Sequence, residues 1–257
     1  MRIAIAQVRG QMEDPAANVS KSKMLLNNIE ADLLVFPELF ATGYDKNCGR
    51  YMKDLDVLFM NKFNQVVSKK KIPTLFGCPV LDESGKLYDC AVLTDGTNRQ
   101  IYRKIHLDVN EKFSEKDVFA AGNEPKIFLH GGLKIGIAIG SDIMFNELFR
   151  WYAANDVDLV ICIAALSKNV IERYERILPA RSVDNSLEII FVNMVGPDPG
   201  FTMAGGSKYV SSDGVVLENF TDGSDVRIIK LDAERTKRSK EGRTFMKEIR
   251  KDIDWSV

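Results

Sequence analysis

Short apolar runs alternate with longer amphipathic segments over most of the chain, and turn residues separate them. Short runs are typical of buried strands, whereas apolar residues that recur every three or four positions are typical of helices. The expected strands are Arg2–Val8, Asp32–Phe36, Ile72–Val80, Lys86–Thr94, Arg99–Lys104, Leu133–Ile139, Val157–Ala164, Leu187–Val195, Ser207–Val210, Val215–Asn219 and Asp225–Leu231. The expected helices are Pro15–Ile29, Tyr51–Lys70, Phe145–Ala154, Val170–Asn185 and Ala233–Ile249.

The order of these elements indicates an α/β protein whose sheet is not purely parallel. The Asp95-Gly96 pair joins two expected strands and is a strong hairpin signal. Inserted hairpins of this kind fit neither a simple doubly wound sheet nor a barrel, whereas two sheets packed face to face between helices would fit. Two segments are expected to be loops, namely the one around Phe113 and Gly122 and the Pro/Gly-rich one from Asn193 to Gly206.

The sequence HGGLKIGIAIGSDIMFNELFR, residues 130–150, is expected to form the centre of the fold. It predicts a buried strand, a tight turn and an amphipathic helix. Such a turn holds one residue above the sheet beside the positive end of a helix, which is where nucleophilic hydrolases place their nucleophile. Here the residue at the strand tip is Gly140, followed by Ser141 and Asp142. A plain turn with an N-cap is the alternative interpretation.

Composition points to a single domain that acts on a small molecule. The 257 residues are 45 % hydrophobic, which is enough to bury a full core in one domain spanning residues 1–257. Lys and Arg number 35 against 36 Asp and Glu, a net charge of −1, and no long basic run suggests nucleic acid or a membrane surface as a partner. No apolar run reaches the length of a membrane span, and no signal peptide is evident, so a cytoplasmic location is expected.

The four cysteines are widely separated along the chain. Cys48, Cys78, Cys90 and Cys162 show neither the paired spacing of a zinc site nor a dense disulfide framework. They are expected to be reduced thiols in the core or the pocket, and no metal or cofactor is expected.

Two further polar residues follow expected strands. Glu38 comes after Pro37 at the carboxyl end of a strand, the edge at which open α/β sheets place their chemistry. Lys104 ends the second strand of the hairpin. Taken singly, Glu38 also suits an ordinary helix start, and a lysine at a strand end is usually only solvated.

Together the motifs are more specific. The segments PELFATGY around Glu38, YRKIHL around Lys104 and GIAIGSDIMFNE around Gly140 resemble the three motifs of the nitrilase superfamily of carbon–nitrogen hydrolases. The resemblance extends through LPARSVDN and GGSKYVSSDG to cover most of the chain. It implies a four-layer αββα sandwich and hydrolysis of an amide, nitrile or carbamoyl bond by a Glu-Lys-Cys triad. It also implies that Glu38 is the general base, that Lys104 supports the oxyanion and that Glu111 is a second carboxylate orienting Lys104 or the substrate.

One position departs from this family. The cysteine nucleophile is replaced by Gly140, and flanking residues on both sides fix the alignment. Ser141 occupies the following position, where its side chain is expected to point elsewhere and to bond the local backbone, while its N–H would be a second oxyanion donor. The chain is therefore expected to be an inactive form of an amidase-type hydrolase, disabled by mutation. The alternative is a natural member that binds small molecules or serves as a scaffold.

The resemblance gives less guidance on ligand and assembly. Tyr44, Phe113 and Leu166 are expected to line the pocket, and either Lys168 or Arg173 is expected to meet a substrate carboxylate; surface solvation is the ordinary alternative for both cations. Family members associate through the helix after the nucleophile and through C-terminal segments, which implies a homodimer or larger. The aromatic residues Phe149, Trp151 and Tyr152 are candidate interface anchors. A glutaminase domain that feeds a synthetase is disfavoured, because no second domain follows Val257.

Overall fold

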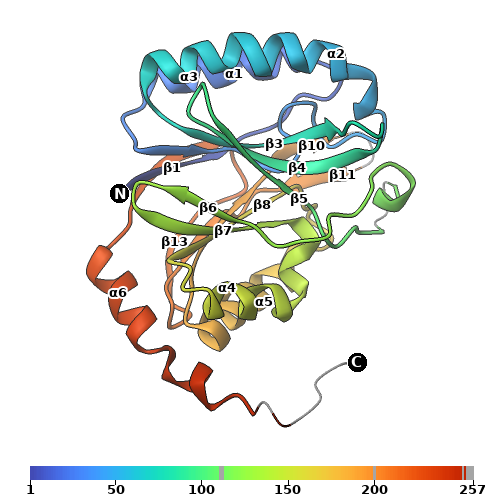
Figure 1. Cartoon of the computed structure of the whole chain (residues 1–257). Coiled ribbons are helices and arrows are strands. Elements are labelled where there is room, and N and C mark those ends of the chain that lie inside the picture. Colours follow the sequence, from blue (N-terminus) through green and yellow to red (C-terminus); the bar gives the residue numbers. More distant parts are fainter. Residues whose placement is uncertain (110–112, 199–200, 251, 253–257) are drawn as a thin grey trace.

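Two six-stranded sheets pack face to face in the centre of the molecule, with helices on both outer faces (Figure 1). The computed structural model describes residues 1–109, 113–198, 201–250 and 252. The first sheet has the strand order β14-β1-β2-β3-β4-β5, and the second has the order β13-β12-β9-β8-β7-β6. A separate pair, β10 and β11, forms a small hairpin.

The strands are β1 (Arg2–Gln7), β2 (Leu33–Val35), β3 (Thr74–Leu81), β4 (Leu87–Thr94), β5 (Arg99–Arg103), β6 (Ile127–His130), β7 (Leu133–Ile139), β8 (Leu159–Ala164), β9 (Glu188–Asn193), β10 (Val195–Asp198), β11 (Phe201–Ala204), β12 (Lys208–Val210), β13 (Val216–Asn219) and β14 (Asp225–Lys230). The α-helices are α1 (Pro15–Asn28), α2 (Met52–Leu55), α3 (Asn64–Lys70), α4 (Asn146–Ala154), α5 (Ile171–Asn185) and α6 (Ala233–Glu241). A π-helical segment, Asp56–Phe63, joins α2 to α3, so the helix expected over Tyr51–Lys70 is continuous but not uniformly α.

The alternation of side chains along the strands produces these layers. In β1, Ile3 and Ile5 point into the core between the sheets, whereas Ala4 and Ala6 face the layer that contains α1. In β7, Ile137 belongs to the core between the sheets and Ala138 to the layer that contains α4 and α5. Each large apolar side chain buried in this way contributes roughly 1.5–3 kcal/mol. The expected four-layer α/β sandwich is therefore confirmed.

Two expectations about individual elements were wrong, and a third needs a refinement. The Pro/Gly-rich segment after Asn193 is not a loop throughout, because Val195–Asp198 pairs with Phe201–Ala204 as an antiparallel hairpin. The segment before the central strand contains β6, which pairs antiparallel with β7 through a turn at Gly131 and Gly132. The tail is helical as expected, with an α-helix to Glu241 and a 3-10 helix over Arg243–Glu248. Glycine and proline content masked the hairpin, and the shortness of β6 left no periodic signal.

Strand direction brings several chain segments to one edge of the double sheet. β1, β2 and β3 are parallel, and β5 runs in the same direction as β3 because β4 is antiparallel to both. In the second sheet β7, β8 and β9 are parallel. The residues that follow β2, β5, β7 and β8 meet at the candidate site described below. No helix in the described part of the chain has the length and apolarity needed to cross a membrane.

Candidate active site

Glu38 lies three residues beyond the end of β2 and accepts hydrogen bonds from segments of both sheets. Its Oε1 accepts a hydrogen bond from Lys104 Nζ at 2.6 Å, and its Oε2 accepts the backbone N–H of Ala165, just after β8, at 2.7 Å. The next residue, Leu39, has the left-handed φ of 46°, a conformation that costs energy for a side chain and is often found at functional sites. The loop sits so close to Gly77 that a Cβ there would lie 2.1 Å from the Leu39 nitrogen. Only glycine fits beneath Glu38.

Lys104 is the cation at the centre of the site. Its Nζ lies 2.6 Å from Glu38, 2.7 Å from Glu115 Oε1 and 3.8 Å from Asp89 Oδ2. All four side chains are buried. Glu115 is fixed in turn by the hydroxyl of Tyr44, which donates to Oε1, and by the N–H of Asp108, which donates to Oε2.

The charges in this cluster control one another's protonation. Burial would lower the pKa of Lys104, but the carboxylates of Glu115, Glu38 and Asp89 raise it well above its usual value. Lys104 is therefore an ammonium at any ordinary pH. Burial raises the pKa of Glu38, and the charge of Glu115 adds to this, while Lys104 opposes both effects. A carboxylate with a raised pKa is a better proton acceptor, as general base catalysis requires.

Gly140 follows β7 and opens a 3-10 turn over Gly140–Met144. The turn is fastened by the carboxylate of Asp142, which accepts hydrogen bonds from the Tyr102 hydroxyl and the Ile139 N–H through one oxygen. The other oxygen faces the N–H and the Nδ1 of His106 at 2.9 Å. Since His106 lies two residues after Lys104, Asp142 joins the Gly140 turn to the segment that carries the lysine.

The backbone at Gly140 aims its missing side chain at Glu38 and Lys104. A Cβ at this position would lie 2.9 Å from Lys104 Nζ and 3.0 Å from each carboxylate oxygen of Glu38. The φ of Gly140 is +47°, the left-handed region. The following residue points away, because the Ser141 hydroxyl donates to the carbonyl of His106. Position 140, and not position 141, is therefore the one whose side chain would touch both the carboxylate and the ammonium.

A cavity of about 670 Å³ opens onto this cluster. Its wall includes four of the residues expected to bind substrate, namely Tyr44, Ser141, Leu166 and Arg173. Half of the remaining lining residues precede α5 or lie in its first turns. These lining residues are Ser167, Asn169, Val170, Glu172, Tyr174, Arg176 and Ile177.

Three of the expected site residues are not among the described residues that line the cavity. Phe113 packs against the ring of Tyr44, with centroids 5.1 Å apart, and does not line the cavity itself. Lys168 pairs with Asp222 at 2.9 Å and is also not among the lining residues. Glu111 falls outside the described residues. The carboxylate that contacts Lys104 in the manner expected of Glu111 is Glu115.

Sequence reasoning missed both Glu115 and Asp89. Glu111 and Glu115 are four positions apart in the sequence, and nothing in the sequence around them indicates that Tyr44 and Asp108 bind Glu115. Asp89 did leave a signal, because it is a carboxylate inside the apolar strand β4. A charged residue in a buried strand needs a partner.

None of the four cysteines substitutes for the missing nucleophile. All of them are buried free thiols. Burial raises the pKa of Cys48 to about 12 and that of Cys162 well above its usual value, so neither readily forms the reactive thiolate.

Comparisons with known proteins identify the family of the chain. The family model described as carbon-nitrogen hydrolase matches residues 2–241. The chain is similar to an (R)-stereoselective amidase from Pseudomonas sp, with 29 % identity over 97 % of this chain and 92 % of that protein. It is also 29 % identical to a glutamine-dependent NAD(+) synthetase from Thermotoga maritima over 90 % of this chain, but spans only 42 % of that protein.

A solved structure gives the same result. The cysteine-to-alanine mutant of the Nesterenkonia AN1 amidase, from the nitrilase superfamily, superposes with a TM-score of 0.81 at 25 % identity. The match covers 95 % of this chain and 97 % of the amidase. The chain described here belongs to the carbon–nitrogen hydrolase family of the nitrilase superfamily.

Proposed function

We propose that this chain carries the site of an amidase-type hydrolase for a small amide or carbamoyl compound, in which Gly140 takes the place of the nucleophilic cysteine. The observation that carries the proposal is the position of the absent side chain. A Cβ at residue 140 would lie within 3.0 Å of both Glu38 and Lys104. The chain as written binds such a compound but does not cleave it, and restoring a thiol at position 140 tests the proposal directly.

The cluster suits each step of acyl transfer from an amide. Glu38 accepts the thiol proton, the thiolate attacks the carbonyl carbon, and Lys104 with the N–H of Ser141 supports the oxyanion. The tetrahedral species collapses to a thioester, and the leaving amine takes the proton from Glu38. Glu38 then deprotonates water, which attacks the thioester and releases the acid and the thiol. Without a side chain at 140, only binding remains.

The alternative is a natural family member that binds or scaffolds without chemistry. The retained network of Glu38, Lys104 and Glu115 favours an active ancestor, because buried charges without a catalytic role cost stability and are readily replaced by apolar residues. The codon at position 140 in the source genome separates the two. A cysteine codon there identifies a disabled enzyme, and a glycine codon favours the binding protein.

Arg173 is proposed to bind a carboxylate on the substrate. It lines the cavity from the first turn of α5, whereas Lys168 is paired with Asp222 and lies outside the lining. We expect Arg173→Ala to weaken binding of an acidic amide, such as glutaramate, roughly 10-fold while leaving a neutral amide of equal length unchanged, since a hydrogen bond to a charged group contributes about 1.5–3 kcal/mol. Titration calorimetry on the chain as written measures both affinities.

Lys168→Ala is the matched control for this measurement. It removes a cation from the same region without touching the cavity wall, and both affinities should stay as they are. If Arg173→Ala and the unchanged chain bind the acidic amide equally well, Arg173 does not contact a substrate carboxylate. A loss in Lys168→Ala alone would transfer the role to Lys168.

A homodimer or larger assembly is proposed through α4 and the C-terminal segment. Of the three aromatics considered as anchors, Phe149 and Tyr152 are wholly buried within the chain and cannot serve, which corrects that expectation. Trp151 is 39 % exposed, and Phe145 and Phe245 are exposed to a similar extent.

We expect sedimentation at micromolar concentration to show a dimer, and Trp151→Glu to shift it towards monomer. A monomeric unchanged chain contradicts the proposal.

A further inference from the structure

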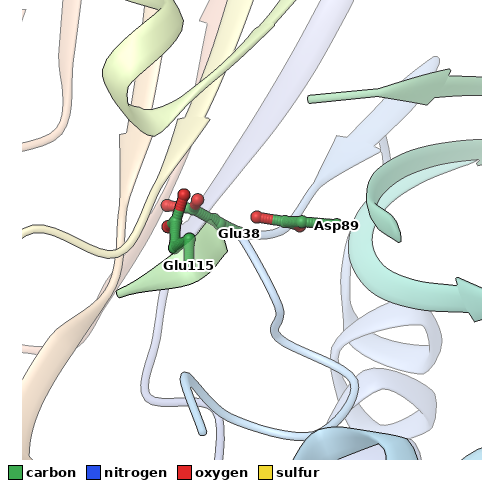
Figure 2. Close-up of side chains that lie close together, drawn as sticks. All are labelled: Glu38, Asp89 and Glu115. Carbon is green, nitrogen blue, oxygen red and sulfur yellow. The ribbon is translucent and has the colours of Figure 1, made fainter. Parts of the chain in front are cut away.

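Three carboxylates surround a single ammonium in the candidate active site. Glu38, Asp89 and Glu115 have oxygens within 4.8 Å of one another, and all three are buried (Figure 2). Such a trio could hold a metal ion, but the Lys104 ammonium already lies 2.6–3.8 Å from all three. With every group ionised, three negative charges would face one positive charge away from water. That excess is costly at low dielectric.

Asp89 is the member of the trio that lacks a donor. It lies on β4 beside the end of β5, where its own carbonyl accepts the N–H of Lys104. Its side chain is 0 % exposed and points towards Glu38 and Glu115 (Figure 2). Among the described residues, no donor reaches either of its carboxylate oxygens. Glu38, by contrast, accepts from Lys104 and Ala165, and Glu115 accepts from Lys104, Tyr44 and Asp108.

A proton on Asp89 resolves both problems. It lowers the net charge of the cluster from −2 to −1, and it turns one orphan oxygen into a donor. The acceptor within reach is the carboxylate of Glu38, with which Asp89 forms a side-chain hydrogen bond. Two carboxylates cannot bond without a proton between them, and the proton belongs on Asp89, because Glu38 already has two donors of its own.

We propose that Asp89 is a neutral carboxylic acid in the folded protein, donating a hydrogen bond to Glu38 and acting as a positioning residue for the Glu38–Lys104 pair. Asp89 is not among the residues that line the cavity, and the three atoms nearest to a Cβ at position 140 belong to Lys104 and Glu38. Its effect passes through Glu38. The bond from Asp89 lowers the pKa of Glu38, against the burial that raises it, and so keeps the base ionised and ready to accept a proton.

The groups that face Asp89 from each neighbouring element agree with this assignment. Glu38 comes from the loop after β2, Lys104 from the end of β5 and Glu115 from the short 3-10 helix Glu115–Asp117. The thiols of Cys48, Cys78 and Cys90 are also close enough to interact with Asp89, and burial raises the pKa of each, so all three are neutral. Burial raises the pKa of Asp89 well above its usual value, and the charges of Glu38 and Glu115 add to this against the opposition of Lys104.

The protonation state of Asp89 can be observed in the chain as it stands. With aspartate labelled at the side-chain carboxyl carbon, carbon-detected NMR at pH 7 should show one resonance at the chemical shift of a protonated carboxylic acid. This resonance should not move over the pH range in which the other aspartates titrate. Asp89→Asn should remove that resonance. A spectrum of the unchanged chain in which every aspartate is ionised at pH 7 overturns the proposal, as does a protonated resonance that survives in Asp89→Asn.

Stability against pH gives a second readout that a merely structural role would not move. Between the pKa of Asp in the unfolded chain and the raised pKa in the folded protein, the folded state holds one proton more. The stability that this proton on Asp89 contributes to the folded state is fully present at low pH, and it is lost as pH rises through the raised pKa. The unfolding constant of the unchanged chain, divided by that of Asp89→Asn, should therefore rise about tenfold per pH unit within this window.

Asp222→Asn is the control for the pH series. Asp222 is exposed, and its hydrogen bond and ion pair with Lys168 lower its pKa, so its small contribution is lost as pH falls. The corresponding ratio for Asp222→Asn should move slightly in the opposite direction. A flat or falling ratio for Asp89→Asn would mean that Asp89 is ionised beside Lys104. If Asp89→Asn does not fold, the NMR spectrum of the unchanged chain decides alone.

Discussion

Gly140→Cys should convert this chain into an amide hydrolase. The added thiol would contact both the base and the ammonium, since the Cβ position lies 2.9 Å from Lys104 Nζ and 3.0 Å from the oxygens of Glu38. Loss of a nucleophile costs up to about 10⁶-fold in turnover in a comparable triad, so we expect the thiol to raise hydrolysis at least roughly 10³-fold over the Gly140 chain. Ammonia release from a panel of amides and carbamoyl compounds measures it, and added hydroxylamine should divert the thioester to a hydroxamate.

The turnover of Gly140→Cys should stay below that of an unstrained active site, for a steric reason. A side chain at position 140 must adopt the left-handed φ of +47° and displace its neighbours by a few tenths of an ångström. The nearest atom is the end of the flexible Lys104 side chain, which can give way. Strain of order 1–3 kcal/mol is typical of such positions and is often found at functional sites.

Two variants control this experiment. Gly140→Ala imposes the same backbone and steric demands without a thiol and should stay inactive. Gly140→Ser should gain much less than cysteine, because a hydroxyl ionises far less readily. Activity in Gly140→Cys should fall as pH is lowered through the raised pKa of Glu38, since the base must be ionised. A folded Gly140→Cys without turnover on the whole panel would leave the binding-protein interpretation in place.

The resemblance of three motifs to those of the nitrilase superfamily predicts the meeting of Glu38, Lys104 and Gly140, and the fold explains it. Each follows a strand, and the carboxyl ends of strands that run in one direction share an edge of the sheet. Tyr44 and Leu166 were also expected in the pocket, and both line the cavity. The family motifs, together with the local pattern of strands and turns, therefore carry much of the site.

What the sequence could not supply depends on contacts between distant segments. The contact of Glu115 with Lys104 depends on Tyr44 and Asp108, which bind Glu115 only in the folded chain. The exclusion of Lys168 from the cavity rests on Asp222, far along the chain in sequence. Side-chain partners of this kind have no local signature. Phe149 and Tyr152 are the exception, because their spacing of three positions on an amphipathic helix places both on the buried face and did carry a local signal.

Removal of the central cation should destabilise the protein more than most single changes. Lys104→Met keeps the length of the side chain but leaves Glu38, Asp89 and Glu115 around an apolar group. Breaking a buried ion pair by removing one partner costs about 3–5 kcal/mol. The exposed pair of Lys168 and Asp222, with side chains 52 % and 68 % exposed, is the contrast, and Lys168→Met should cost at most about 1 kcal/mol.

The pH dependence of the Lys104→Met defect should reveal its electrostatic origin. Without the ammonium, the buried carboxyls must take up protons to remain folded, so their folded pKa values rise further above those in the unfolded chain. Stability from such groups is present at low pH and is lost as pH rises through the folded values. The difference in unfolding free energy between Lys104→Met and the unchanged chain, measured by denaturant titration, should therefore be larger at pH 8 than at pH 5. A loss of stability of equal size at pH 5 and pH 8 would indicate lost packing around the lysine stem. It would contradict the view that Lys104 stabilises the protein by neutralising buried carboxylates.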